Sequence, residues 1–271
     1  MKKLLALLMT ACMLFAFAGC GGETTSSDGT ASKSDSETVK NNGKLVIGIT
    51  DYAPLDYEEI KGSGEWVGFD ADMARAFAKT LGVEAEFVVI DWDNKIMELN
   101  SGSIDCVWNG MTIGDEVKNG MLVTNAYLKN TQVVVVPKDK ADKYQTLESV
   151  KDLNFAAEAG SAGEDALEAL NYKVTAVTAQ ADALMEVAAG TSDAAVIDLI
   201  MAGAVIGEGT SYENLTYTVG VAEEENFGVG FRKGSDLTEK LNEFFKTTYA
   251  DGSMMETAKT YGVQESILEQ K

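Results

Sequence analysis

Apolar residues recur along the first part of the chain in two alternating patterns. A mostly apolar run at residues 45–50 predicts a buried strand. Apolar side chains then recur every four residues, which predicts a helix with one buried face, at Phe69, Met73, Phe77 and Leu81. Asp70 is placed to cap the N-terminus of this helix, and Gly82 ends it. Further patterns predict a strand, a short helix and a strand at 86–90, 93–101 and 105–108.

The same order of elements returns later in the chain. The predicted strand, helix, strand, helix and strand are residues 154–158, 161–170, 173–178, 181–189 and 194–198. A short string also repeats, since Glu98-x-x-x-Gly102-x-x-Asp105 matches Glu186-x-x-x-Gly190-x-x-Asp193. Two βαβαβ units of this kind predict two α/β lobes, each a mostly parallel sheet flanked by helices.

Two lobes in one chain need crossings between them. The apolar run 133–136, ended by Pro137, is placed for the outward crossing, and the return is expected near 224–228. Predicted helices at 236–249 and 253–261 then rejoin the first lobe. The expected division is 44–136 and 225–271 for lobe 1 and 137–224 for lobe 2. Sheets of this type bind ligands beyond the carboxyl ends of their strands, so a cleft is expected between the lobes, with hinge closure over its ligand.

The first 43 residues have a different character. Residues 1–19 combine Lys2 and Lys3, a short apolar stretch and small residues before Cys20, which is the layout of a secretory signal. The cysteine directly after the small residues resembles a bacterial lipobox, although Phe17 stands where leucine is usual. Cleavage there leaves a lipidated Cys20. Residues 20–43 are small, polar or charged, which predicts a flexible tether after the lipid.

Composition excludes several function classes. The formal charge is −21, and about −23 once Lys2 and Lys3 leave with the signal (−21 minus 2), so a nucleic-acid role is not expected. The chain has no histidine, which removes the commonest metal ligand and general base. Cys106 is the cysteine that remains beside Cys20, so no internal disulfide is expected. Neither a metal nor another cofactor is predicted.

The ordered motifs resemble the polar amino-acid (family 3) extracellular solute-binding proteins of ABC transporters. The matching segments are GKLVIGITDYAPLDY, GEWVGFDADMARAFAKTLG, DWDNKIMELNSGSIDCVWNGMTI, QVVVVPK, AEAGSAGEDAL, DAAVIDLIMA and FGVGFRKGSDL. The resemblance implies a periplasmic-binding-protein-like (type II) fold with a two-crossing hinge. It also implies a monomer that captures a small polar solute such as an amino acid and hands it to an ABC permease. Together with Cys20, it implies a protein that is lipid-anchored to the outer face of the cell membrane.

The resemblance also implies which residues bind the ligand. Asp198 matches the aspartate that accepts the ligand's α-ammonium, and a carboxylate at a strand end suits a cation. The turn after the matching strand of lobe 1 contributes backbone and hydroxyl contacts. At the start of a lobe 2 helix, backbone N–H groups suit a carboxylate. Tyr52 matches a family aromatic that covers the ligand, and Trp92 follows another strand end, where it is placed to line the same wall. The remaining candidates are Asn109, Gly110, Thr112, Ser161 and Ala162. Solvated acids, helix caps and core packing are the competing interpretations.

One position departs from the family pattern. The arginine that clamps the ligand's α-carboxylate in the family is Val117 here. The two arginines of the chain, Arg75 and Arg232, lie elsewhere in the sequence, and Lys118 offers only a point charge. The alternatives are therefore a ligand without a free α-carboxylate and, in a different class, a secreted dehydratase-like enzyme or a sensor. We expect no enzyme, because the cleft candidates for acid–base chemistry are carboxylates and tyrosines.

The Cys20 hypothesis makes a direct prediction. Cys20→Ala removes the acyl acceptor, so the variant is expected in the medium instead of the membrane fraction, because the remaining tether is polar. Immunoblotting of the salt-washed membranes measures this, with Cys106→Ala as the matched control that stays with the membranes. A Cys20→Ala variant that still sediments with the membranes after the wash contradicts lipidation.

Overall fold

The computed structural model describes residues 34–271. It begins with helix α1 (Asp35–Asn42), capped by the Ser34 side chain and ended by Gly43 in the left-handed conformation. The prediction of a flexible tether through residue 43 was therefore wrong for its last nine residues. Ser36 and Val39 are buried, and Ser36 donates from its backbone nitrogen to Asp236 at 3.0 Å. Packing against the fold stabilises a helix that its polar composition did not predict. The predicted signal and Cys20 lie outside the described residues.

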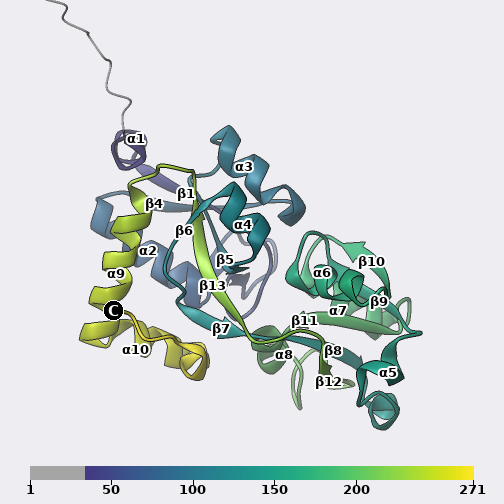
Figure 1. Ribbon diagram of the computed structural model, residues 1–271. Coiled ribbons are helices and arrows are strands. Elements are labelled where there is room, and N and C mark those ends of the chain that lie inside the picture. Colours follow the sequence, from purple (N-terminus) through teal and green to yellow (C-terminus); the bar gives the residue numbers. More distant parts are fainter. Residues whose placement is uncertain (1–33) are drawn as a thin grey trace, which may run out of the picture. The chain divides into compact units, whose positions relative to one another are not determined.

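The first sheet has the strand order β4-β1-β5-β13-β6, with β7 also paired to β13 (Figure 1). Its strands are β1 (Lys44–Ile49), β4 (Glu84–Val89), β5 (Cys106–Thr112), β6 (Leu122–Val123), β7 (Leu128–Asn130) and β13 (Glu225–Phe231). Strands β4, β1 and β5 are parallel, and β13 runs antiparallel to β5. A small hairpin of β2 (Tyr57–Glu58) and β3 (Trp66–Val67) precedes the first long helix.

The second sheet has the order β10-β9-β11-β8-β12. Its strands are β8 (Gln132–Pro137), β9 (Asn154–Glu158), β10 (Lys173–Val177), β11 (Ala194–Asp198) and β12 (Leu215–Gly220). Strands β10, β9 and β11 are parallel, and β8 runs antiparallel to β11. Each sheet thus combines a parallel trio with one antiparallel strand that arrives from the other lobe, β13 in the first sheet and β8 in the second. This confirms the predicted two-lobed type II α/β fold.

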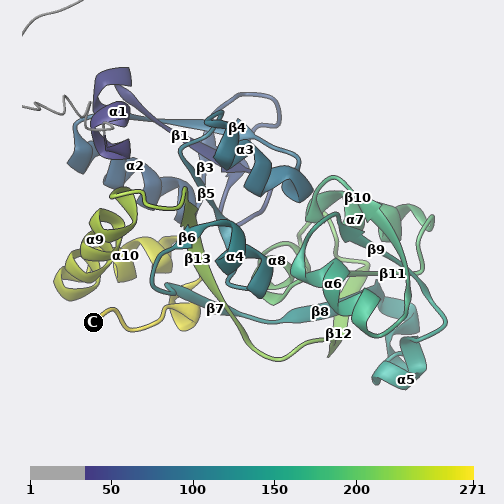
Figure 2. The ribbon, with the colours of Figure 1, turned by 45° about the horizontal axis from the view of Figure 1, so that its top comes forward.

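The two crossings lie side by side in the views of Figures 1 and 2. In the outward crossing, Asn130 ends β7 in the first sheet and Gln132 begins β8 in the second. In the return crossing, Glu225 begins β13 and pairs with Asn130. The whole of β8 belongs to the second sheet, whereas the predicted division at 136 placed most of it in lobe 1. The continuous apolar run could not show which sheet would bury it.

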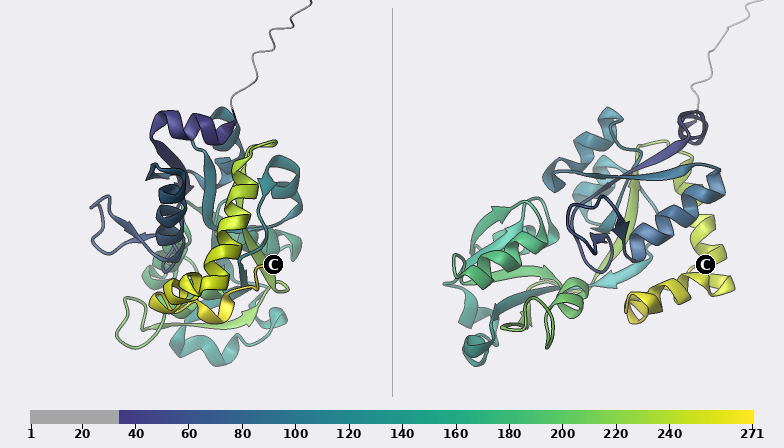
Figure 3. Two further views of the ribbon diagram at one scale, coloured as in Figure 1. Left: turned by 90° about the vertical axis from the view of Figure 1, so that its left-hand side faces the viewer. Right: turned by 180° about the vertical axis from the view of Figure 1, so that it is seen from behind.

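Helices cover both sheets, with one group beside each (Figure 3). The first lobe has α2 (Phe69–Leu81), the 3-10 turn η1 (Trp92–Asn94), α3 (Lys95–Ser101), α4 (Asp115–Gly120), α9 (Leu237–Asp251), α10 (Ser253–Thr260) and η3 (Gln264–Ser266). The second lobe has η2 (Lys138–Lys143), α5 (Leu147–Val150), α6 (Ala162–Ala169), α7 (Gln180–Ala189) and α8 (Leu199–Val205). None of the helices within residues 34–271 is both long and apolar enough to cross a bilayer.

Helix α2 has the predicted buried face but not the predicted cap. Its N-cap residue is Gly68, with φ at 128°, and no side chain caps the helix. A Cβ at Gly68 would lie 2.1 Å from the Leu55 carbonyl oxygen, so a side chain there is excluded. Asp70 instead points into the interior, where it is fully buried. The hydrophobic face of α2 packs near α10, and Tyr261 donates a hydrogen bond from its hydroxyl to Asp72 at 2.7 Å.

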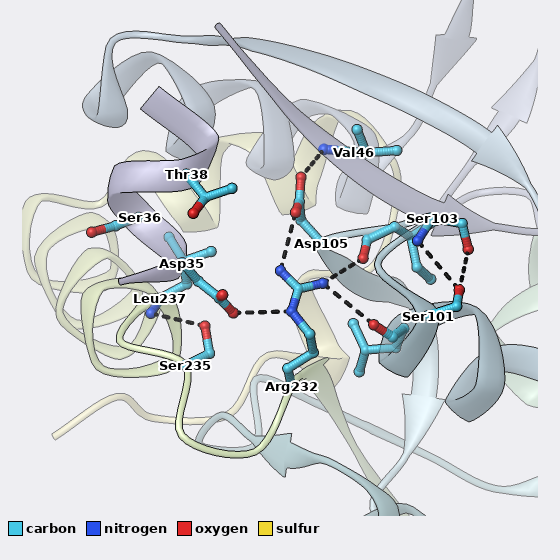
Figure 4. Close-up of polar contacts among 12 residues, drawn as sticks. Asp35, Ser36, Thr38, Val46, Ser101, Ser103, Asp105, Arg232, Ser235 and Leu237 are labelled. Carbon is cyan, nitrogen blue, oxygen red and sulfur yellow. Dashed lines mark hydrogen bonds and ion pairs between the residues drawn. The ribbon is translucent and has the colours of Figure 1, made fainter. Parts of the chain in front are cut away.

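Arg232 joins three segments of the first lobe just after β13 (Figure 4). Its guanidinium contacts Asp35 of α1 and Asp105 before β5, each at 3.2 Å. It also donates to the carbonyl oxygens of Leu99 and Ile104, at 3.3 and 2.7 Å. The planar fork suits several acceptors at once, and its surroundings are largely buried. Arg232 is therefore a structural residue and does not replace the arginine of the family's ligand clamp.

Arg232→Met is expected to lower the free energy of unfolding by about 2–4 kcal/mol, because it leaves part-buried carboxylates and carbonyls without their donor. Urea unfolding measures the change. Lys44→Met is the control, since Lys44 forms an exposed ion pair with Glu86 and its loss should cost about 1 kcal/mol or less. Equal losses in the two variants contradict the structural role of Arg232.

Candidate functional site

A cleft lies between the carboxyl ends of strands from both sheets. Seven of the eight predicted ligand residues line it, namely Trp92, Asn109, Gly110, Thr112, Ser161, Ala162 and Asp198. The exception is Tyr52, whose side chain is buried and is absent from the lining. A Cβ at Gly110 would lie 2.7 Å from the Tyr52 ring, so the ring packs directly beneath that glycine. The Tyr52 ring therefore packs against Gly110, while its hydroxyl lies close enough to Asp198 to affect the pKa of that carboxyl.

The lobe 1 side of the cleft is the last part of β5 itself, where its register with β13 shifts, so the predicted turn after residue 108 is part of the strand. The Asn109 side chain accepts hydrogen bonds from the Thr50 backbone nitrogen and hydroxyl, at 3.0 and 2.9 Å, and donates to Asp56 at 2.8 Å. The Gly110 backbone nitrogen donates to Asp70 at 2.9 Å. These donors and acceptors are therefore occupied within the protein. Thr112 is therefore the predicted residue of this segment that can still contact a ligand through its side chain. Gly110, with φ at 56°, allows a ligand to approach the backbone closely.

Asp70 was assigned the wrong role from the sequence. It accepts hydrogen bonds from Gly110 and from the Tyr127 hydroxyl, the latter at 2.7 Å. Burial raises the pKa of Asp70 to about 6, against the lowering effect of these bonds. Burial also raises the pKa of the neighbouring Asp56 well above its usual range, and the Asp70 charge adds to that shift. The pair stabilises the floor of the cleft from below, a role that only the tertiary fold reveals.

Asp198 ends β11 and is held by amide side chains. Its carboxylate accepts from Asn130, Gln132 and Gln180, and its backbone nitrogen donates to the Gln180 side chain at 2.9 Å. It precedes α8 but makes no capping bond, so the competing interpretation as a helix cap does not hold. Burial, followed by the charge of Glu225, raises the pKa of Asp198 to about 8.

Glu225 shares the amide donors of Asp198. Asn130 and Gln132 donate to its carboxylate at 2.6 and 2.7 Å. Two carboxylates thus lie around the same amide groups, one at the end of a lobe 2 strand and the other at the return crossing. Like charges this close repel each other, so a positive group beside Asp198 would stabilise both.

The N-terminus of α6 forms part of the lobe 2 side. The Ser161 hydroxyl accepts from the Glu164 backbone nitrogen at 3.2 Å and is therefore the helix cap. The Gly160 nitrogen donates to the Glu164 side chain at 2.7 Å. Ala162 lies in the first turn, where backbone N–H groups have no acceptor within the helix, and it lines the cleft. The backbone N–H of Ala162 is therefore the group at this helix end that remains for the predicted contact with a ligand carboxylate.

Two buried charged residues of the cleft, Lys95 and Glu158, were not predicted from the sequence, and neither were Asp115, Glu116 and Asp165 of its lining. Lys95 is 3% exposed, and its ammonium donates to the carbonyl oxygens of Gly160 and Trp92 at 2.9 and 3.3 Å. Glu158 ends β9 and is 2% exposed. Burial raises the pKa of Glu158 to about 8, while Lys95 opposes the shift. The signal for Glu158 was available, because it ends a buried strand just as Asp198 does.

Val117 lines the cleft at the position of the expected arginine, and it is buried. Arg232 is bound in the network described above, and Arg75 pairs with Asp72 on α2. Lys118 is not part of the lining either. The cation that the cleft does contain is Lys95, which belongs to α3. A helix position there gave no indication that its side chain would reach the Gly160 carbonyl of the other lobe.

The sequence matches the family model of bacterial extracellular solute-binding proteins, family 3, over residues 45–264. This chain belongs to that family. It is 30% identical over 266 residues to the arginine-binding extracellular protein ArtP of Bacillus subtilis, covering 96% of this chain and 98% of ArtP. The family consists of solute-binding proteins of the amino-acid type in ABC transport, which agrees with the two-lobed fold and its cleft.

Solved structures of similar proteins have the same fold. An amino acid ABC transporter substrate-binding protein from Streptococcus pneumoniae, bound to L-arginine, matches with a TM-score of 0.77 and 28% identity, over 88% of this chain and 100% of that one. An ancestral amino acid-binding protein described as a precursor of cyclohexadienyl dehydratase matches with a TM-score of 0.76 and 30% identity, over 84% and 99%. The family 3 fold thus occurs both in binding proteins and in the ancestry of an enzyme.

The buried cleft acids predict a pH dependence of stability. The pKa values of Glu158 and Asp198 are raised to about 8 in the folded protein, whereas unfolded carboxyls titrate near about 4. Between these values the folded state binds protons that the unfolded state has released, so the free energy of unfolding falls as pH rises from about 4 to about 8. The double variant Glu158→Gln with Asp198→Asn should show a smaller fall. Urea unfolding of ligand-free protein across this range measures both slopes, and identical slopes contradict the prediction.

Proposed function

We propose that this protein captures an amino acid in the cleft between its lobes and delivers it to the permease of an ABC importer. The observation that carries the proposal is the buried Asp198 carboxylate, which lines the cleft and is oriented by Asn130, Gln132 and Gln180. A buried carboxylate of this kind is stabilised when a cation arrives, and the α-ammonium of an amino acid supplies one.

The other end of an amino acid needs a donor. Val117 supplies none, but the Lys95 ammonium and the first turn of α6 both line the cleft. An ammonium has three donors, and the two acceptors of Lys95 leave one for a ligand carboxylate. Lys95 comes from lobe 1 and its Gly160 acceptor from lobe 2, so a ligand bound here is contacted from both sides. This arrangement supports hinge closure about the crossings at Asn130–Gln132 and Glu225.

Delivery and anchoring complete the proposal. The resemblance to ArtP and to the arginine-bound pneumococcal protein supports an importer role, and the junction before Cys20 supports a lipid anchor on the outer face of the membrane. A monomer that exchanges its ligand with a permease fits both. The related ancestor of a dehydratase favours an enzyme as the second candidate, with Glu158 as its buried acid.

Asp198→Ala tests the proposal. Amino acids are first screened by the rise in unfolding temperature that a bound ligand produces. For the amino acid that binds, the variant should lose about 2–4 kcal/mol of binding free energy, or roughly 30- to 1000-fold in dissociation constant, because it removes one partner of a buried ion pair. Isothermal titration calorimetry measures the change.

Asp152→Ala is the control, since Asp152 is exposed and distant from the cleft lining, and its dissociation constant should stay within about threefold of the original. Circular dichroism confirms that the variants are folded. An unchanged dissociation constant in a folded Asp198→Ala protein removes Asp198 from the site. Turnover of the bound solute, detected by mass spectrometry, would favour the enzyme instead.

A further inference from the structure

We propose that Glu158 is a second ligand-binding carboxylate, which selects amino acids with a positively charged side chain. The proposal rests on the proposed function and names the substrate class of the same cleft. Asp198 contacts the α-ammonium that all amino acids share. Glu158 then contacts the cation that distinguishes the basic amino acids from the rest.

The sheet brings the two carboxylates together. Strands β9 and β11 are parallel neighbours, with Ala195 opposite Ala156, and they end at Glu158 and Asp198. Neighbouring strands lie about 4.8 Å apart, so both side chains start from the same edge of the sheet. Both line the cleft. A ligand seated against this edge meets both acids, which the register directs toward opposite faces of the sheet.

Glu158 still lacks a partner for one of its oxygens. The carboxylate is almost completely buried, and its Oε1 has no hydrogen-bond partner within residues 34–271. Lys95 lines the same cleft but forms no ion pair with Glu158 in this part of the chain, because its ammonium donates to the carbonyls of Gly160 and Trp92. Burying a carboxylate oxygen without a donor is costly, and a ligand cation would supply that donor.

The charge of the whole cleft lining also favours a ligand with a positively charged side chain. The lining contains five acidic side chains, from Asp115, Glu116, Glu158, Asp165 and Asp198, and a single basic one, from Lys95. An amino acid with a neutral side chain brings no net charge into this environment, and an acidic one adds to the negative charge. A basic amino acid brings a net positive charge and offsets part of it. The cleft is therefore complementary to a basic amino acid.

L-arginine and L-citrulline separate the two carboxylate roles, because they have nearly the same shape but only arginine has a charged side chain. Calorimetry on the purified full chain should show arginine binding at least about 30-fold more tightly than citrulline. Glu158→Gln should weaken arginine by about 30-fold or more and change citrulline by less than about threefold. Asp198→Asn should weaken both ligands by a similar factor, because both carry the α-ammonium.

Asp152→Asn is the control. It removes a carboxylate at an exposed position outside the cleft lining, so its effect on arginine should stay within about threefold. Glu158→Asp keeps the charge but withdraws it by one methylene, and should also weaken arginine selectively. The Glu158→Asp variant provides a second measurement of arginine affinity if Glu158→Gln lowers the unfolding temperature.

Three results overturn the proposal. The first is an equal loss for arginine and citrulline in folded Glu158 variants, which makes Glu158 a partner of the shared ammonium. The second is an arginine affinity that Glu158→Gln leaves unchanged. The third is a native protein that binds neither ligand at millimolar concentration. In that third case the amino-acid function itself is judged separately, by the effect of Asp198→Ala on whichever amino acid raises the unfolding temperature.

Discussion

The structure depends on the hydrogen bonds that Asn130 and Gln132 donate to Asp198 and Glu225. These four residues come from the outward crossing, the return crossing and the end of a lobe 2 strand. The amides bring two carboxylates close together at the point where the chain passes between the sheets. The ligand site and the hinge therefore share one polar network. A change of charge at Asp198 alters hydrogen bonds at both crossings.

The first lobe has its own buried polar floor, made by Asp70, Asp56 and Asn109 below Gly110. Its hydrogen bonds join Asn109 to Thr50 and Asp56, and Gly110 to Asp70, which fixes this part of β5. In the second lobe, the strand-end acids at Glu158 and Asp198 line the cleft directly. Both sides of the cleft thus combine internal hydrogen bonds with charge, since Lys95 of the first lobe lines the cleft and the amides hold Asp198 of the second.

Much of this arrangement could be predicted from the sequence. The alternation of strand and helix patterns gave both lobes, and the predicted strands at 154–158 and 194–198 match β9 and β11. Asp198 was found because it matches the family aspartate that accepts the ligand's α-ammonium, and its place at a strand end agrees with that role. Lys95 and the true role of Asp70 could not be found in this way, since each acts on a residue distant in sequence, Gly160 and Gly110 respectively. The helix at Asp35–Asn42 was missed for the same reason, because tertiary contacts stabilise it.

Helix α1 has a mechanical consequence. Asp236 and Arg232 hold it to the first lobe through Ser36 and Asp35, so the described chain starts as a fixed part of that lobe. A pulling force on the chain before Ser34 would therefore act on the first lobe and not on the crossings. In a protein tethered by that end, the first lobe would stay fixed relative to the tether. The second lobe, with both of its strand-end acids, would be the one that moves on closure.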